Sequence, residues 1–325
     1  MDEIRAVTLV GVGIMGAGLA AEYAASGRRV TLYARSEASA ARGRERVAAA
    51  LEALERGGVL PTGGAAEALA RVGTATGLAA AVAGADLVVE SIPEDLALKR
   101  ALFAELDALC PPNVILATNT SGLPITRIAE GLHHPERVLG THYLNPPHLM
   151  PPVEVIPGER TAPEVVETVR AMLSAMGKAP IVVRREVPGF VWNRLQFAIM
   201  REAFWLIEQG VATQEEIDLV LRRGLGRRWS IAGPFASLDL GGIDTMTMVA
   251  RYLLPELSAA TAPPAFLEDL IAAGRYGAKT GAGFYDWPEE RLRETIARRD
   301  TALLAALRAD RAEMDEAGED GRAGD

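Results

Sequence analysis

The chain has 325 residues, 49% of them hydrophobic and 24% charged, and a formal net charge of −9. This length suggests about two domains, and the apolar content excludes a wholly disordered protein. The acidic charge balance argues against a nucleic-acid partner, and no apolar run is long enough to cross a membrane. A single cysteine excludes a disulfide scaffold and a thiolate metal cluster, so we expect a cytoplasmic protein without a metal site.

The first half of the chain alternates short β-branched runs with longer amphipathic segments. This pattern is typical of βαβ units, which form a doubly wound parallel sheet, and it predicts the α/β class. The expected strands lie at 6–10, 29–33, 86–90, 114–118, 138–142, 151–156 and 179–183. The expected helices lie at 14–26, 37–56, 96–109, 125–130 and 163–176.

From residue 189 onward the sequence shows long helical patterns and no convincing strand. The expected helices lie at 190–209, 213–222, 242–257 and 263–273, and a charged helix begins at 289. Thr213 and Glu216 have the spacing of a capping box ahead of an apolar run. We therefore expect an α/β domain over 1–187, an all-helical domain over 188–312, and an acidic, disordered tail over 313–325.

A glycine-rich turn follows the first strand and opens the first helix. Residues 11–16 read GVGIMG, which is the G-x-G-x-x-G pattern in a strand–turn–helix context. Gly11 permits the tight turn, Gly13 lets the backbone approach a pyrophosphate, and Gly16 lets helix and strand pack closely. The free N–H groups of the helix N-terminus would hold the phosphates. The motif, including Ile14 and Met15, predicts dinucleotide binding by a Rossmann-type domain.

The end of the second strand lacks the acidic residue that usually holds the adenosine ribose of NAD. Its place is taken by Arg35 and Ser36, whose guanidinium and hydroxyl groups suit a 2′-phosphate. The interpretation we favour is therefore a preference for NADP(H). The alternative is a relaxed NAD(H) site in which Arg35 stacks on the adenine.

Five further motifs follow in order along the chain. They are VESIPEDL at 89–96 with Lys99, NTS at 119–121, HYLNPP at 142–147 with VEVI at 153–156, GFVWNRL at 189–195, and KTGAGFY at 279–285. On these motifs the chain resembles, over residues 6–287, the L-3-hydroxyacyl-CoA dehydrogenase family with its lambda-crystallin and L-gulonate 3-dehydrogenase relatives. The resemblance implies a small-molecule substrate and a homodimer formed through the helical domain.

Oxidation of a secondary alcohol needs a base that takes the hydroxyl proton while hydride leaves for the nicotinamide. His142 suits this role because an imidazole titrates near neutral pH and because the residue ends a strand, where ligands bind. Glu154 lies on the next strand and could hold the far imidazole nitrogen. The resemblance implies the same two roles. It also implies that Ser121 and Asn193 face the substrate and donate to its reacting oxygen, with a helix N-cap as the alternative role of Asn193.

Positive charge is carried by 31 arginines and only three lysines, a bias that codon usage in a GC-rich genome explains. Two of the lysines, Lys99 and Lys279, match positions at which the family contacts the cofactor, as do Glu94 and Asn145. Lys178 matches no such position, and we expect it to be solvated.

Two departures from the acyl-CoA enzymes bear on the substrate. The helix after the second strand, which in those enzymes supplies serine and lysines to CoA, has neither residue type over 42–58, although its four arginines keep CoA open. Arg227 and Arg228 lie in a stretch that resembles gulonate and carnitine dehydrogenases, where an arginine facing the cleft would suit a free carboxylate. The alternative is a solvated arginine pair, and residues 233–244 resemble the acyl-CoA type again.

The sequence therefore predicts an NAD(P)-dependent oxidoreductase of an L-3-hydroxy or 3-keto group, similar to 3-hydroxyacyl-CoA dehydrogenase. The alternatives are a dehydrogenase of a free 3-hydroxy acid, a biosynthetic ketoreductase that uses NADPH, and a non-enzymatic protein of the crystallin kind. The intact set of His142, Glu154, Ser121 and Asn193 favours an enzyme, because a purely structural descendant need not keep it.

Overall fold

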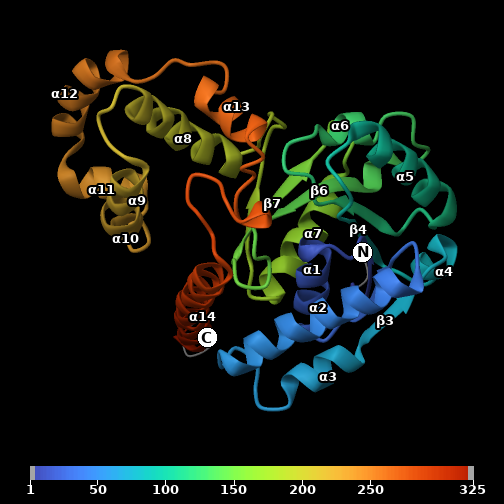
Figure 1. Cartoon of the computed structure of the whole chain (residues 1–325). Helices are drawn as coiled ribbons and strands as arrows, with labels where there is room; N and C mark the ends of the chain where they lie inside the picture. Colours follow the sequence, from blue (N-terminus) through green and yellow to red (C-terminus); the bar gives the residue numbers. More distant parts are fainter. Residues whose placement is uncertain (1–3, 321–325) are drawn as a thin grey trace. The chain divides into compact units, whose positions relative to one another are not determined.

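The computed structural model describes residues 4–320, with side chains described as far as residue 312 (Figure 1). The backbone forms two compact units. The first unit runs from the N-terminus to Asn193 and also takes in the chain from Ile296 onward, whereas the second comprises Arg194–Thr295.

Eight strands form one sheet in the first unit, in the order β3-β2-β1-β4-β5-β6-β7-β8. Every neighbouring pair is parallel except β6 and β7, which are antiparallel. The strands are β1 Ala6–Val10, β2 Arg29–Tyr33, β3 Val72–Ala75, β4 Leu87–Glu90, β5 Ile115–Thr118, β6 Val138–Tyr143, β7 Pro152–Pro157 and β8 Ala179–Val182. The expected doubly wound, Rossmann-type sheet is confirmed, with its order reversing between β1 and β4.

Helices cover both faces of the sheet, as buried parallel strands require. One face packs against α1, α2, α3 and α7, and the other packs against α4, α5 and α6 (Figure 1). Their bounds are α1 Ile14–Ala25, α2 Glu37–Arg56, α3 Gly64–Ala70, α4 Leu78–Val82, α5 Leu96–Leu109, α6 Ile125–Ile128 and α7 Pro163–Ala175, with a 3-10 turn Pro135–Arg137 before β6.

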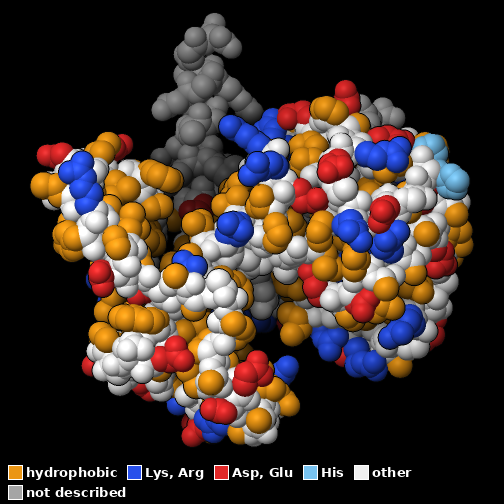
Figure 2. All heavy atoms as spheres, turned by 90° about the horizontal axis from the view of Figure 1, so that it is seen from above, with side chains coloured by type: hydrophobic (Ala, Val, Ile, Leu, Met, Phe, Trp, Pro, Cys, Tyr) orange, Lys and Arg blue, Asp and Glu red, His pale blue; other side chains and the backbone are white. Residues whose placement is uncertain are grey.

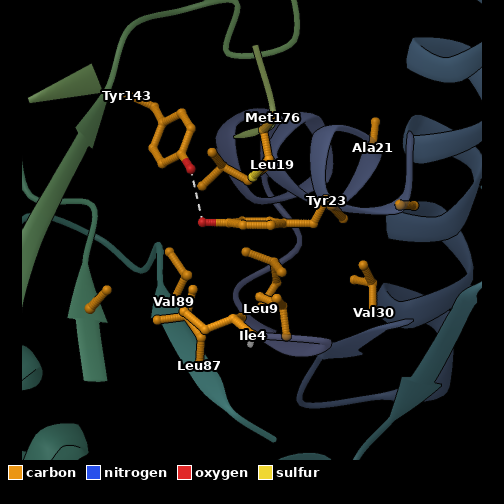
Figure 3. Close-up of a cluster of buried hydrophobic side chains, with 14 of the residues drawn as sticks. Ile4, Leu9, Leu19, Ala21, Tyr23, Val30, Leu87, Val89, Tyr143 and Met176 are labelled. Carbon is orange, nitrogen blue, oxygen red and sulfur yellow. Dashed lines mark hydrogen bonds between the residues drawn. The ribbon is translucent and has the colours of Figure 1, made fainter. Parts of the chain in front are cut away.

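A buried tyrosine pair joins helix α1 to strand β6 inside the core of the first unit. The hydroxyls of Tyr23 and Tyr143 lie 2.8 Å apart, surrounded by aliphatic side chains such as Leu19 and Met176 (Figure 3). Burial raises the pKa of Tyr23 to about 12, so the pair stays protonated. Each hydroxyl thus has a partner, which removes the cost of an unpaired buried polar group.

Three elements of the first unit escaped the sequence interpretation, namely α3, β3 and α4. The strand reads VGTA, and only its first residue, Val72, is buried. It lies at the edge of the sheet and pairs with β2 alone. A short edge strand with a glycine and little burial lacks the apolar run by which the other strands are recognised.

The second unit is helical, as expected. The predicted capping box is present, because the Thr213 hydroxyl accepts from the Glu216 amide while the Glu216 carboxylate accepts from the Thr213 amide. The helices are α8 Trp192–Glu208, which starts at the end of the first unit, α9 Gln214–Val220, a π-helical turn Leu221–Leu225, α10 Gly226–Trp229, α11 Pro234–Gly241, α12 Ile243–Leu253 and α13 Ala265–Ala272. Among the described residues no helix is both long enough and apolar enough to span a membrane.

The last helix, α14 Glu289–Asp320, starts in the second unit and returns to the first. Leu304 and Leu307 pack with Leu54 of α2 and with Leu149, and Arg311 donates to the Val59 carbonyl at 3.0 Å. Sequence interpretation had placed residues up to 312 in the helical domain, but these apolar contacts group the chain from Ile296 with the sheet. The expected tail over 313–325 is helical as far as residue 320, and its last five residues lie outside the described part.

Candidate active site

The N-terminus of α1 has the geometry that the glycine motif predicted. Gly11 has a φ of 120°, and a Cβ there would lie 2.4 Å from the Ser91 carbonyl oxygen. A Cβ on Gly16 would lie 2.1 Å from the Gly11 carbonyl oxygen. Both positions therefore exclude every larger residue. A Cβ on Gly13, in contrast, would meet nothing within 4 Å, so this glycine leaves open space above the helix end.

That open space suits the pyrophosphate of a dinucleotide. Gly13 is the N-cap of the 12-residue helix α1, and it provides no side chain to cap the first N–H groups. The first turn has no acidic residue that would repel an anion, and Ile14 and Met15 continue the motif there. Unpaired N–H groups and the helix dipole together make an anion site. The residues present thus fit the cofactor, which supplies the hydride acceptor when it is bound.

The end of β2 carries the two residues expected at the adenosine. Arg35 is exposed, whereas the Ser36 hydroxyl caps α2 by accepting from the Ser39 amide at 3.3 Å. The capping role is a sequence-local one, because serine is a favoured N-cap. Ser36 therefore has a structural function whatever nucleotide is bound. Arg35 has no such capping role.

A buried carboxylate organises the carboxyl ends of β4 and β5. The Glu90 side chain is fully buried and accepts from Lys99 Nζ, from Thr118 Oγ1 and from the Ile92 amide, each at 2.6 Å. Lys99 is itself 1% exposed and lies 3.5 Å from Glu94. The sequence had marked Lys99 and Glu94 but not Glu90, although an acidic residue that ends a wholly apolar strand is a signal of such a role.

Glu94 extends this network to the loop after β5. It accepts from the Ser121 amide at 2.9 Å and from the Thr120 hydroxyl. The expected pair is also brought together, since Asn193 Nδ2 donates to the Ser121 carbonyl oxygen at 2.7 Å. The loop that carries Ser121 is therefore held from both sides.

His142 and Glu154 form a cross-strand pair on the antiparallel strands β6 and β7. The two residues lie directly opposite each other in the ladder, and His142 Nδ1 is 2.7 Å from Glu154 Oε2. Both side chains are nearly buried, with exposed fractions of 6% and 3%. An ionised Glu154 accepts the Nδ1 hydrogen, which leaves Nε2 as the nitrogen that can take a proton from a substrate.

Glu154 is also fixed by a strained turn. Its second oxygen accepts from the amides of Val191 and Trp192 at 2.7 and 2.9 Å. Phe190, one residue earlier, adopts a φ of 51°, a left-handed conformation rare for a bulky residue, and its ring lies 5.8 Å from that of His142. Burial raises the pKa of Glu154, but the hydrogen bonds from His142 and the two amides outweigh it and hold the pKa below its ordinary value.

This lowered pKa predicts that Glu154 contributes to the stability of the folded chain in a way that depends on pH. Because the ionised form is favoured in the folded chain, Glu154 stabilises it above the unfolded pKa near 4.3, and this contribution is lost as the pH falls through the folded pKa. We expect Glu154→Gln to lower the free energy of unfolding at pH 7 by about 1.5–3 kcal/mol and to have less effect in acid. Urea unfolding at pH 7 and in acid measures the two free energies, and Glu105→Gln, at an exposed position, is the control. A loss of stability that does not depend on pH would contradict the prediction.

The remaining predicted residues belong to other segments of the chain. Asn145 is exposed in the loop after β6. Arg227 and Arg228 in α10 and Lys279, whose Nζ lies 5.2 Å from the Tyr276 ring centre, belong to the second unit. Their roles stay predictions.

The expectation for Lys178 is wrong, because its side chain is buried rather than solvated. Its exposed fraction is 3%, and Nζ pairs with Glu22 Oε2 at 2.6 Å. The sequence offers no local signal for this pairing, since the two residues lie on different elements far apart along the chain.

Two family models match the chain. The model described as 3-hydroxyacyl-CoA dehydrogenase, NAD binding domain, matches residues 6–187, and the one described as 3-hydroxyacyl-CoA dehydrogenase, C-terminal domain, matches residues 189–287. Among curated relatives, an L-carnitine dehydrogenase of Streptomyces griseus is 38% identical, with 95% of this chain and 90% of the relative covered.

Solved structures also match the chain. The structure of 5-formyl-3-hydroxy-2-methylpyridine 4-carboxylic acid 5-dehydrogenase, an NAD+-dependent dismutase, matches with a TM-score of 0.89 and 35% identity, covering 95% of this chain and 99% of its own. An (S)-3-hydroxybutyryl-CoA dehydrogenase of Ralstonia eutropha matches with a TM-score of 0.72 and 34% identity, covering 88% of this chain and 100% of its own. The comparisons support NAD(H) as cofactor and give no support to the expected preference for NADP(H).

Proposed function

Because this chain belongs to the 3-hydroxyacyl-CoA dehydrogenase family, we propose that it is an NAD-dependent dehydrogenase of a small free hydroxy acid rather than of a CoA thioester. The observation that carries the chemistry is the His142–Glu154 pair, which lies near the carboxyl end of β6, as the glycine turn follows the carboxyl end of β1 in the same sheet. Relatives of both substrate kinds occur in the family, so the choice between them depends on this chain's own residues.

In the proposed reaction His142 Nε2 takes the proton of the substrate hydroxyl. Glu154 keeps the imidazole in the tautomer that has a free Nε2 and stabilises the imidazolium that forms. Ser121, from the loop after β5, and Asn193, in the first turn of α8, orient the reacting oxygen. In the reverse direction the imidazolium returns the proton to a ketone oxygen, so the same pair supports both directions.

The arginines of α2 argue against CoA. CoA carries phosphates, which need cationic groups that are free to bind them. Each arginine of α2 already donates a hydrogen bond to another group of the protein. The shortest of these bonds, at 2.9 Å, runs from Arg46 to the Val12 carbonyl oxygen. The others are Arg42 to Ser39, Arg44 to the Val72 carbonyl and Arg56 to Glu52. The helix also carries four glutamates, so it has no net positive charge that would attract those phosphates.

The solved structure of the dismutase supports the same choice. Its name gives a free carboxylic acid, and it matches this chain with a TM-score of 0.89, against 0.72 for the 3-hydroxybutyryl-CoA dehydrogenase structure. We therefore infer that this chain acts on a free acid.

Initial rates of NAD+ reduction test the substrate proposal. Three free acids, namely L-carnitine, 3-hydroxybutyrate and 5-formyl-3-hydroxy-2-methylpyridine 4-carboxylate, are compared with 3-hydroxybutyryl-CoA at equal concentrations. We expect the highest kcat/KM with a free acid. A higher kcat/KM with the CoA thioester would overturn the substrate choice, and no turnover of any of them would favour a non-enzymatic protein.

For the cofactor we propose NAD(H). We also propose that Arg35 allows weaker binding of NADP(H). An exposed guanidinium at the end of β2 attracts a 2′-phosphate, so Arg35→Ala should weaken NADPH binding while changing NADH binding little. Fluorescence titration of the two reduced cofactors measures this. A tighter wild-type dissociation constant for NADPH than for NADH would contradict the proposal and restore the NADP(H) preference.

We propose a homodimer formed through the second unit. Of residues 194–295, all of which are described, only Ala203, Ser258 and Gly283 are buried. Ile231 and Leu240 are 90% and 83% exposed, and Figure 2 shows hydrophobic side chains, in orange, across the visible face of this unit at the left. In an isologous dimer the same surface of each copy forms the interface, so a second copy would cover this apolar surface with an identical one.

Sedimentation velocity measures the oligomeric state. We expect a wild-type dimer, and we expect Leu240→Glu to shift it to monomer, because a charge on a buried apolar interface is costly. Leu98→Glu, on the first unit, is the matched control and should leave the dimer intact. A wild-type monomer at micromolar concentration would refute the proposal.

We also propose a cytoplasmic location. Cys110 is the one cysteine of the chain, and it is buried and unpaired. A free thiol suits a reducing compartment.

A further inference from the structure

Lys178 lies where three elements of the first unit meet. It follows the C-terminal turn of α7 and precedes β8. Its Nζ lies 2.6 Å from Glu22 Oε2, 2.8 Å from the Pro147 carbonyl oxygen and 3.2 Å from the Met150 carbonyl oxygen. An ammonium group has three N–H donors, so each of them has an acceptor here.

These acceptors belong to the two parts of the chain that build the candidate active site. Glu22 lies on α1, the helix that opens at Gly13. Pro147 and Met150 lie in the loop between β6 and β7, which we call the β6–β7 loop, residues 144–151. This loop starts two residues after His142, carries Asn145, and leads into the strand of Glu154. Lys178 thus joins the cofactor helix to the connection between the two catalytic strands.

The loop packs on α1 along the same face of the helix. A Cβ on Gly18, one turn before Glu22, would lie 2.6 Å from Pro147 Cγ, so the Pro147 ring packs directly on the helix backbone at Gly18. The hydrogen bond between Tyr23 and Tyr143 adds a second polar link beside it (Figure 3). Lys178 is the group that donates to the carbonyl oxygens of Pro147 and Met150 within the loop.

We propose that Lys178, together with Glu22, is a positioning residue for cofactor binding and hydride transfer, which rests on the proposed function. The pair holds the β6–β7 loop against α1, and so fixes Asn145 and His142 relative to the nucleotide bound at Gly13. Both side chains are buried and paired with each other, so we assign them a positioning role. When the anchor is lost, the loop spends only part of its time in the binding-competent arrangement, and the apparent affinity for NADH falls by that fraction.

The test compares two buried ion pairs of the same unit. Glu22→Gln/Lys178→Met removes both charges and the bonds to the loop while keeping side-chain length. Asp107→Asn/Arg137→Met is the matched control, since that pair is also buried, with 2% exposed on each side, and it joins α5 to the turn before β6. Melting temperature, the dissociation constant of NADH from its fluorescence, and KM and kcat are measured for both.

We expect both double variants to have a lower melting temperature than the wild type. Only Glu22→Gln/Lys178→Met should also raise the dissociation constant and the KM for NADH, by about tenfold. Lys178→Arg, which keeps the charge and the donors, should restore binding. If the first double variant does not fold, Lys178→Gln should show a smaller shift in the same direction. NADH affinities of the two double variants within about twofold of each other would overturn the proposal. Because NADH binding needs no substrate, this result can be read even if the proposed substrate class fails.

Discussion

His142→Asn is expected to lower kcat by about 100- to 10,000-fold, the usual contribution of a positioned acid–base group. Asparagine places an amide nitrogen near the position of imidazole Nδ1, so Glu154 keeps a donor, but nothing replaces Nε2. The dissociation constant for NADH should stay unchanged, because the glycine turn on α1 is not altered. Steady-state rates and NADH fluorescence measure the two effects.

His133→Asn is the control for this substitution, since His133 is exposed on a loop of the same unit. It should leave kcat unchanged. Near-normal turnover by the His142 variant would remove His142 from the acid–base role, whereas an equal loss of NADH affinity would mean that the substitution disturbs the cofactor site.

Gly13→Val is expected to weaken cofactor binding without unfolding the protein. The backbone at Gly13 is extended, with a φ of −67°, and a Cβ would meet no protein atom within 4 Å, so the apo fold tolerates the side chain. The side chain would instead occupy the space of the pyrophosphate. Overpacking costs about 1–3 kcal/mol, which corresponds to a dissociation constant for NADH that is roughly 5- to 150-fold weaker.

Gly233→Val is the matched control, because Gly233 is also an N-cap glycine with open space around it, on α11 of the second unit. Both variants should show the melting temperature of the wild type to within a few degrees, as a single N-cap change predicts. Unchanged NADH affinity in the Gly13 variant would place the nucleotide elsewhere.

The fold of the first unit was predictable where local sequence determines it. The helix over residues 96–109 and the strand over residues 6–10 have the bounds expected from apolar periodicity. The glycine turn was predictable because close packing between Gly11 and Gly16 admits no other residue. His142 and Glu154 were paired because the motif places them on successive strands, and the antiparallel register then sets them opposite each other.

Other features depend on contacts between distant parts of the chain. Lys178 carries no local mark of burial, and only the packing of α1 and the β6–β7 loop supplies its acceptors. The return of α14 to the first unit depends on Leu304 and Leu307 meeting an apolar site near Leu54, which an amphipathic pattern alone does not identify. Sequence periodicity predicts that a helix has an apolar face but not which surface covers it.

Isotope transfer tests the central claim most directly, namely that the His142–Glu154 site transfers hydride between a hydroxy acid and the nicotinamide. A free 3-hydroxy acid that carries deuterium on its hydroxyl-bearing carbon is incubated with NAD+ and enzyme, and the NADH formed is analysed by mass spectrometry. We predict deuterium in the nicotinamide with the wild type and almost none, over the same time, with His142→Asn. NADH without deuterium, or equal transfer by the two proteins, would contradict the claim.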